Sequence, residues 1–261
     1  MGYFYFDESI HSRAGLIVGA FVHTEAPLEP AVAAVLRRLG LQPGIDEYKS
    51  GTRIPTDPVE AKLREDLRDE IQRLYGRVGL LVAPSTDRHL LARDAMAALK
   101  KLLSTNTFDS RAHTAYFDEG VFTGSTVAHR LAIELDLSEL VTIEPSVDSR
   151  VVGGIQVADL AAHTMATMLL ECLGLVKKQV KAGPNSGYEP DLEFELGFEL
   201  WASLRYQLFS RTVPEAPNGS KLPGPVHDVA SCGLYVSERC NEELRHAAHA
   251  RFGSVYLGCI H

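Results

Sequence analysis

The N-terminal stretch MGYFYFDESI, residues 1–10, decides how the rest of the chain is interpreted. Aromatic residues fill positions 3–6, and side chains of this kind have a high propensity for strands. The run ends on Asp7, Glu8 and Ser9, so a carboxylate is expected where a buried strand closes. Burying an ionised carboxylate is costly unless a partner or a cation compensates for its charge. Asp7 is therefore the first candidate for a site residue.

A second predicted strand has the same kind of ending. Residues 113–118 read HTAYFD, and Asp118 closes the strand. Further strands are predicted at residues 15–22, 77–83 and 140–144, and helices at residues 29–39, 58–75, 87–103, 124–136, 154–173 and 192–210. The first two strands read as a hairpin. A hairpin followed by alternating helices and strands predicts an α/β fold, with a mixed sheet and helices on its faces.

The helix predicted over residues 154–173 carries a third acid on a stripe of its own. Gln156, Asp159 and His163 are spaced i, i+3 and i+7, so they lie on one side of the helix. Apolar or small residues flank this stripe. Asp159 is then either a buried structural acid or a residue that faces the same cleft as the strand-end acids.

Four motifs follow one another along the chain: YFDES at residues 5–9, EYKS at 47–50, YFDEG at 116–120, and DSRVVGGIQVADLAAH at 148–163. In this order they resemble the bacterial domain-of-unknown-function family numbered 3800, over roughly residues 3–170. The resemblance implies a ribonuclease H-like fold. Some members of that family are associated with mobile-element or phage-defence loci. The chain departs from the family at Ile10, where glycine is common, and this change removes no ligand.

The resemblance also implies roles for individual residues. It assigns the metal-binding and catalytic positions to Asp7, Glu47, Asp118 and Asp159. Substrate contacts are expected from Lys49, Ser50, Gln156 and His163. Each expectation has a simpler alternative. Glu47 and Lys49 are often just a surface ion pair in such a loop, and a histidine placed like His163 is often bonded to backbone at the edge of a core.

Hard carboxylate oxygens suit Mg²⁺ or Mn²⁺ as the metal. Two such ions roughly 3.5–4 Å apart can hydrolyse a phosphodiester. We therefore expect a divalent-metal-dependent phosphodiester hydrolase, a nuclease, whose partner is nucleic acid or a phosphorylated small molecule. Two alternatives stay open. One is a catalytically quiet ribonuclease H-like module that binds a nucleotide or a protein, and the other is a metal-dependent phosphatase for small substrates.

The composition restricts these functions further. With 26 basic and 34 acidic residues the net charge is −8, which opposes a general nucleic-acid coat and requires a local patch or bound cations. Neither a signal peptide nor an apolar run long enough for a membrane span is seen, so a cytoplasmic protein without membrane contact is expected. The basic, turn-rich stretch at 177–190 predicts a boundary between a core at 1–176 and a helical or irregular C-terminal extension at 177–261.

Overall fold

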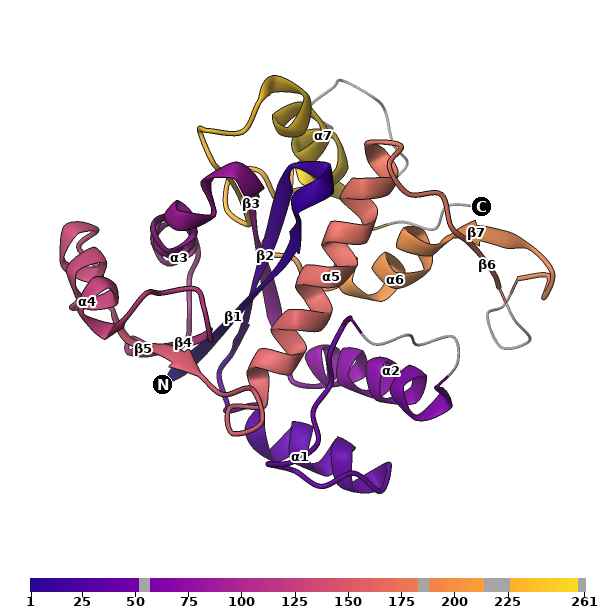
Figure 1. Ribbon diagram of the computed structural model, residues 1–261, viewed down its shortest axis with the longest axis horizontal. Helices are drawn as coiled ribbons and strands as arrows, with labels where there is room; N and C mark the ends of the chain where they lie inside the picture. The colour runs from indigo at the N-terminus through magenta and orange to yellow at the C-terminus, as the bar shows by residue number, and fades with distance from the viewer. Residues whose placement is uncertain (52–56, 183–187, 214–225, 258–261) are drawn as a thin grey trace.

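The computed structural model describes residues 1–51, 57–182, 188–213 and 226–257. Its centre is a six-stranded sheet with the strand order β10-β3-β2-β1-β4-β5. Strand β2 pairs antiparallel with β1 and β3, whereas the pairs β1–β4, β4–β5 and β3–β10 are parallel. Helices cover both faces of the sheet (Figure 1). The α/β fold with a mixed sheet and flanking helices, which the sequence predicts, is confirmed.

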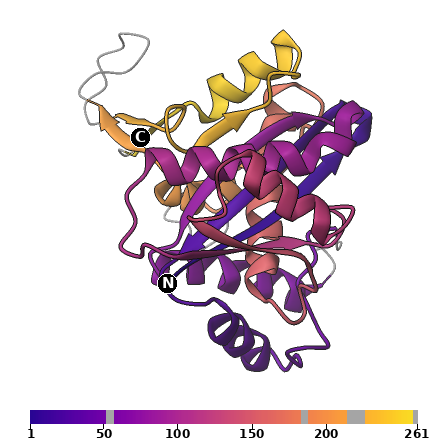
Figure 2. The same ribbon diagram turned by 90° about the vertical axis from the view of Figure 1, so that its left-hand side faces the viewer.

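The strands of the main sheet are β1 (Gly2–His11), β2 (Leu16–Thr24), β3 (Arg77–Pro84), β4 (His113–Asp118), β5 (Val141–Val147) and β10 (Leu234–Val236). One face is covered by α1 (Glu29–Arg38), α2 (Pro58–Arg73), α5 (Gly154–Cys172), α6 (Leu196–Leu204) and α7 (Glu242–Phe252). The other face is covered by α3 (Leu91–Thr105) and α4 (Ser125–Glu134), which lie towards the viewer in Figure 2.

Two small sheets and three 3₁₀ turns complete the described residues. One small sheet holds β8 (Arg211–Val213), β9 (Val226–Asp228) and β11 (Ser254–Tyr256), and the other holds β6 (Gln179–Lys181) and β7 (Glu193–Glu195). The 3₁₀ turns are η1 (Ser12–Ala14), η3 (Ser85–Leu90) and η4 (Arg205–Gln207). In the part of the chain described, no helix is long and apolar enough to cross a membrane.

Strand β1 divides its side chains between the two faces of the sheet. Phe4 and Phe6 belong to the core under α3 and α4, whereas Tyr5 belongs to the core under α5. Successive side chains of a strand point to opposite faces, so Asp7 shares the face of Tyr5. The first candidate acid therefore lies under α5.

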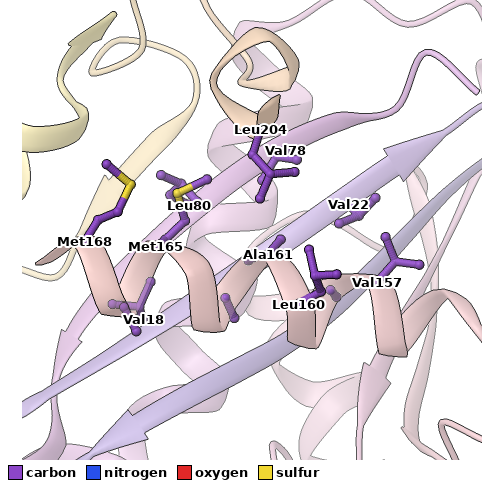
Figure 3. Close-up of a cluster of buried hydrophobic side chains, with 14 of the residues drawn as sticks. Val18, Val22, Val78, Leu80, Val157, Leu160, Ala161, Met165, Met168 and Leu204 are labelled. Atoms are coloured by element: carbon purple, nitrogen blue, oxygen red, sulfur yellow. The ribbon is translucent and has the colours of Figure 1, made fainter. Parts of the chain in front are cut away.

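Helix α5 is the central helix of that face. Of its 19 residues 16 are buried, because the helix packs on β1 and β2 and is covered in turn by α2, α6 and α7. Figure 3 shows Val157, Leu160, Met165 and Met168 of α5 among valines and leucines of the sheet. Each large apolar side chain buried in this way stabilises the fold by about 1.5–3 kcal/mol.

Tyr5 and Gly154 set the distance between β1 and the start of α5. Tyr5 is fully buried, and its hydroxyl accepts a hydrogen bond from the Leu28 N–H (3.0 Å) and donates one to Glu29 (3.2 Å). A Cβ added at Gly154 would lie 2.3 Å from the Tyr5 ring. Since the ring is anchored at the start of α1, it has no free direction in which to move.

The differences between the structure and the expected elements include one strand and one helix that the sequence predicts with other bounds. Strand β1 does not close at Asp7 but continues to His11, because residues 7–11 stay in the ladder with β2, from Ala20 to Leu16. The predicted helix 192–210 is wrong in its first part, since residues 193–195 form β7, which pairs with β6, and α6 ends at Leu204.

The segment after residue 176 also takes part in the main sheet. Strand β10 pairs with β3 as its edge strand, and α7 adds side chains to the core beneath α5. The division into a core at 1–176 and an extension at 177–261 stays a prediction. What the structure adds is that the later segment completes one edge of the sheet.

The close approach at Gly154 leads to a stability prediction. Gly154→Ala should lower the free energy of unfolding by about 1–3 kcal/mol, because the added methyl group overpacks the Tyr5 ring. Urea denaturation followed by circular dichroism measures the change. Gly124→Ala is the control, because a Cβ at Gly124 meets nothing within 4 Å. Equal stability of the two variants would show that α5 does not rest on β1 at this distance.

Candidate carboxylate site

Asp7 and Asp118 come from neighbouring parallel strands. The register between β1 and β4 pairs Tyr5 with Tyr116 and Phe6 with Phe117, so the two acids follow at the next position. The Tyr5 and Tyr116 rings stack at 5.5 Å between centroids, with an angle of 14° between their planes. Both acids share the α5 face of the sheet with these tyrosines. The two YFDE motifs therefore place two carboxylates side by side.

Asp159 approaches the same place from α5 and is held there by Ser50. Its side chain accepts a hydrogen bond from the Ser50 N–H (2.9 Å) and another from the Ser50 hydroxyl (2.5 Å). Hydrogen bonds to an ionised carboxylate are short and roughly twice as strong as neutral ones. Asp159 is 8% exposed, so its position is fixed by these contacts and by the packing of the helix.

Gln156, one turn earlier on α5, connects two loops to the helix. Its side-chain oxygen accepts from the Tyr48 N–H, and its side-chain nitrogen donates to the Ser149 carbonyl, both at 2.8 Å. Gln156 is 1% exposed. Its amide is therefore occupied by backbone groups, and it positions the loops on either side of the site.

Glu47 and Lys49 meet at Ser149. The Ser149 hydroxyl donates a hydrogen bond to Glu47 and accepts one from the Lys49 ammonium at 3.2 Å. The Lys49 ammonium lies 3.4 Å from Glu47 Oε2. In this structure Glu47 faces Lys49 and Ser149, while Lys49 also lies in the field of Asp118 and Asp159.

The electrostatics indicate an excess of negative charge. Burial, followed by the charges of Asp159 and Asp118, raises the pKa of Asp7 well above its usual range. Burial also raises the pKa of Asp118, which Lys49 lowers only in part. Although burial opposes it, the carboxylates of Glu47 and Asp118 raise the pKa of Lys49. The ammonium is thus a counter-ion shared among several acids.

Glu8, the residue directly after Asp7, adds to this charge. Burial, and then the charge of Asp118, raises the pKa of Glu8 to about 7, and its Oε2 atom is buried without a hydrogen-bond partner. Arg88 lowers that pKa in part. The place of Glu8 directly after Asp7 in the YFDES motif is the only sequence signal for it.

The donor set suits a hard cation in its chemistry. Asp7 and Asp118 offer carboxylate oxygens in a buried place where like charges repel, which is where a divalent cation lowers the energy most. Within the described residues, no group of three or more His, Cys, Asp or Glu side chains is placed so that it could hold a metal ion. Mg²⁺ usually takes one or two carboxylates and completes its shell with water and substrate phosphates. Asp7 and Asp118 therefore suit Mg²⁺ or Mn²⁺ by the chemistry of their oxygens, without forming a preassembled ligand group.

His163 lies one turn after Asp159 on the same stripe of α5. Burial lowers its pKa, the charge of Asp159 raises it in part, and His11 and Arg64 are its other charged neighbours. The imidazole is therefore mainly neutral at pH 7, so it can accept or donate a proton at the edge of the acid group.

Ser149 is the residue whose role the sequence did not reveal. Serine next to Asp148 resembles an ordinary turn-capping residue, and only its place in the long motif 148–163 connects it with the site. The structure puts its hydroxyl between Glu47 and Lys49, about a hundred positions away in the chain.

The repulsion among the acids leads to a second prediction. Because the pKa of Asp7 is raised in the fold, the ionised form destabilises the folded state, and stability should fall as the pH rises through the raised pKa. Asp7→Asn should therefore raise the urea midpoint at pH 7 in EDTA. The amide oxygen can still accept the hydrogen bond that the Glu8 N–H donates to Asp7 at 2.6 Å.

Asp66→Asn is the matched control, because Asp66 is equally buried but lies 2.7 Å from Arg38 and 2.9 Å from Lys62. Losing these ion pairs should lower the urea midpoint. If both variants lower it, the Asp7 carboxylate is well compensated in the folded protein, and the picture of excess charge is wrong.

No protein-family model and no curated protein matches the sequence. Among solved structures, a chain of the PCNA–RNase HII complex from Archaeoglobus fulgidus is similar, with 18% identity and a TM-score of 0.37 over 72% of this chain and 82% of that one. Ribonuclease H2 from Pyrococcus horikoshii OT3 is similar with 12% identity and a TM-score of 0.41 over 79% of this chain and 87% of that one. Likeness at this level carries no statement about what this chain binds or cleaves, so the function is argued from the site itself.

Proposed function

We propose that this protein is a divalent-metal-dependent phosphodiester hydrolase that acts on nucleic acid. One observation carries the proposal: carboxylates from β1, β4 and α5 lie on one face of the sheet, where burial, and then the charges of neighbouring acids, raise the pKa of Asp7 and Asp118. A buried group of like charges is destabilising without a cation, and such arrangements are typical of functional sites.

Asp7 and Asp118 are the proposed central ligands, because they lie side by side on adjacent strands and on the same face of the sheet. Asp159 and Glu47 complete the proposed ligand set. Each would have to share or exchange its present partners, the Ser50 donors for Asp159 and Ser149 with Lys49 for Glu47. When bound, the ion would supply the positive charge that draws a phosphodiester to these acids and makes a water molecule more acidic.

The basic side chains near the acids support a phosphate-bearing substrate. Lys49 lies in the field of Asp118, Arg88 in that of Glu8, and Arg64 in that of His163. Lys49 is the best placed of them, since its ammonium contacts Ser149 and Glu47 and also lies in the field of Asp118 and Asp159. In a chain with a net charge of −8, such local cations are what a polyanion needs in order to approach.

His163 and Ser50 have supporting roles in this proposal. A neutral His163 can relay a proton at the edge of the acid group. Ser50 orients the Asp159 carboxylate, because both its N–H and its hydroxyl donate to that side chain. Gln156 positions the two loops and does not contact the substrate in this proposal. Its side-chain oxygen already accepts from the Tyr48 N–H, and its side-chain nitrogen already donates to the Ser149 carbonyl.

A quiet binding module is the second candidate, and one observation favours it. The Asp159 carboxylate is already satisfied by Ser50, and no closed ligand group exists among the described residues. In that case the same acids and Lys49 would bind a nucleotide or a protein, with Lys49 as the anchor, and no hydrolysis would follow.

The nuclease assay separates the two candidates. Wild-type protein should cleave at least one of single-stranded RNA, single-stranded DNA or an RNA–DNA hybrid with Mg²⁺ or Mn²⁺, and EDTA should abolish cleavage. Ca²⁺ should bind without supporting turnover, because its looser coordination orients the attacking water poorly. Asp118→Asn should reduce the rate by two or more orders of magnitude, since a centre of this kind fails as a unit.

Glu119→Gln is the control for that assay, because it makes the same change of charge one position along, at an exposed side chain. Its rate should stay within about threefold of wild type, as expected for a surface charge near a site. The hydrolase proposal fails if wild type cleaves nothing on the panel, or if Asp118→Asn and Glu119→Gln cleave equally well.

A further inference from the structure

A second cavity opens at the other end of the sheet from Asp118. It has a volume of about 800 Å³ and is lined by residues from four segments, 23–25, 74–77, 104–109 and 209–211. His23, which lines this cavity, pairs with Phe4 near the start of β1. Strand β4 runs parallel to β1 and ends at Asp118, so Asp118 lies at the opposite end of these strands. Small-molecule sites have volumes of roughly 300–1,000 Å³. The cavity is therefore large enough for a ligand and separate from the carboxylate site.

Two arginines give the cavity its positive groups. Arg77, at the start of β3, pairs with His23 through the strand ladder, and its exposed side chain makes no hydrogen bond or ion pair with the residues that the structure describes. Arg211 donates a hydrogen bond to the Thr105 carbonyl, which fixes its guanidinium at the wall and leaves other N–H donors available. Guanidinium groups bind phosphate through two parallel hydrogen bonds, so the pair is suited to a phosphate group.

Tyr75 lies at the rim of this cavity in an unusual backbone conformation. It is 87% exposed, and its backbone has a φ of 52°, in the left-handed region that favours glycine. The residue directly follows the end of α2, where Gly or Asn is the usual choice. An aromatic ring held in solvent at such a position is a ready surface for a planar base, and such stacking accepts any base.

The floor of the cavity holds an uncharged histidine beside the carboxylate of Glu25, and its side chains are well fixed. His23 has a side chain that is 5% exposed, and its Nε2 atom lies 3.8 Å from Glu25 and has no hydrogen-bond partner among the residues described. Burial lowers the pKa of His23 to about 4, so the ring is uncharged at pH 7. Phe108 packs edge-on against His23, with 4.7 Å between ring centroids. Glu25 in turn holds the loop, by accepting from the Ser110 hydroxyl at 2.5 Å.

These features match the parts of a nucleotide. We propose that the cavity binds a nucleotide, either free or at the end of a strand, with its phosphate on Arg77 and Arg211 and its base on Tyr75. Asp109 and the hydroxyls of Ser104 and Ser210, which also line the cavity, can accept from the amino groups and sugar hydroxyls of such a ligand. Residues 209–211 belong to the part of the chain beyond residue 176, so this proposal gives that part of the chain a role in binding.

Calorimetry in EDTA tests the proposal without any contribution from a metal. The probes are 5′-AMP, adenosine, inorganic phosphate and a 5′-phosphorylated tetranucleotide. AMP should bind at least about tenfold more tightly than adenosine or phosphate alone, because each half of the ligand uses a different wall of the cavity. A tetranucleotide that binds more tightly than AMP identifies a strand end as the ligand, and one that binds more weakly identifies the free nucleotide.

Two variants locate the binding. Arg77→Gln should weaken AMP about tenfold or more and leave adenosine unchanged. Tyr75→Gly should weaken AMP to a similar extent while the melting temperature holds or rises, because glycine suits the left-handed backbone. Arg37→Gln, an exposed arginine at the end of α1, is the control and should bind AMP as wild type does.

The outcomes separate this proposal from the hydrolase. Asp118→Asn should bind AMP like wild type, whether or not the protein cleaves nucleic acid. The proposal is overturned if neither AMP nor the tetranucleotide binds at millimolar concentration, or if phosphate alone binds as tightly as AMP. Unchanged AMP affinity in both Arg77→Gln and Tyr75→Gly would overturn it as well.

Discussion

The packing of α5 against β1 and β2 is the interaction on which the rest of the structure depends. With 16 of its 19 residues buried, the helix can lie on the sheet at only one height and in one rotation. The bare backbone at Gly154, in contact with the Tyr5 ring, fixes the height at one end. This rotation of α5 points Asp159 towards the sheet face that carries Asp7 and Asp118. Ordinary apolar packing thus brings together three acids that repel one another.

A layer of polar contacts then connects the loops to this frame. Gln156 holds the backbone at Tyr48, and Asp159 holds Ser50, over sequence separations of 108 and 109 residues, and Gln156 also holds the nearby Ser149 carbonyl. Lys49 is carried into the field of the acids by the same loop. The site is accordingly built on rigid elements, and the Lys49 ammonium comes from a loop whose backbone is anchored on both sides of that lysine. Under the proposed function, Lys49 would give way to a cation while this backbone stays in place.

The sequence predicted the parts that depend on local patterns. Alternation and helical spacing located β1 to β5 and α1 to α5, and the YFDE motifs identified Asp7 and Asp118. It could not show that β1 passes beyond Asp7, because three of the residues 8–11 are polar or charged and their extended form depends on the hairpin with β2. Strand β10 was missed because three residues at a sheet edge are too few to show the alternation of apolar and polar residues that marks a strand. The cavity at Arg77 was missed because the four segments that line it come together only in the folded chain. Asn241, which accepts from the Leu244 N–H at the start of α7, was a signal that could have been used.

The central claim is that the buried acids form a cation site, and anomalous diffraction from Mn²⁺-soaked crystals tests it most directly. The account predicts an anomalous peak within about 2.0–2.3 Å of carboxylate oxygens of both Asp7 and Asp118, with Lys49 displaced or turned towards Glu47. Crystals of Asp7→Asn treated in the same way should lack the peak. Well-ordered wild-type acids with no peak between them, at millimolar Mn²⁺ and neutral pH, would contradict the account.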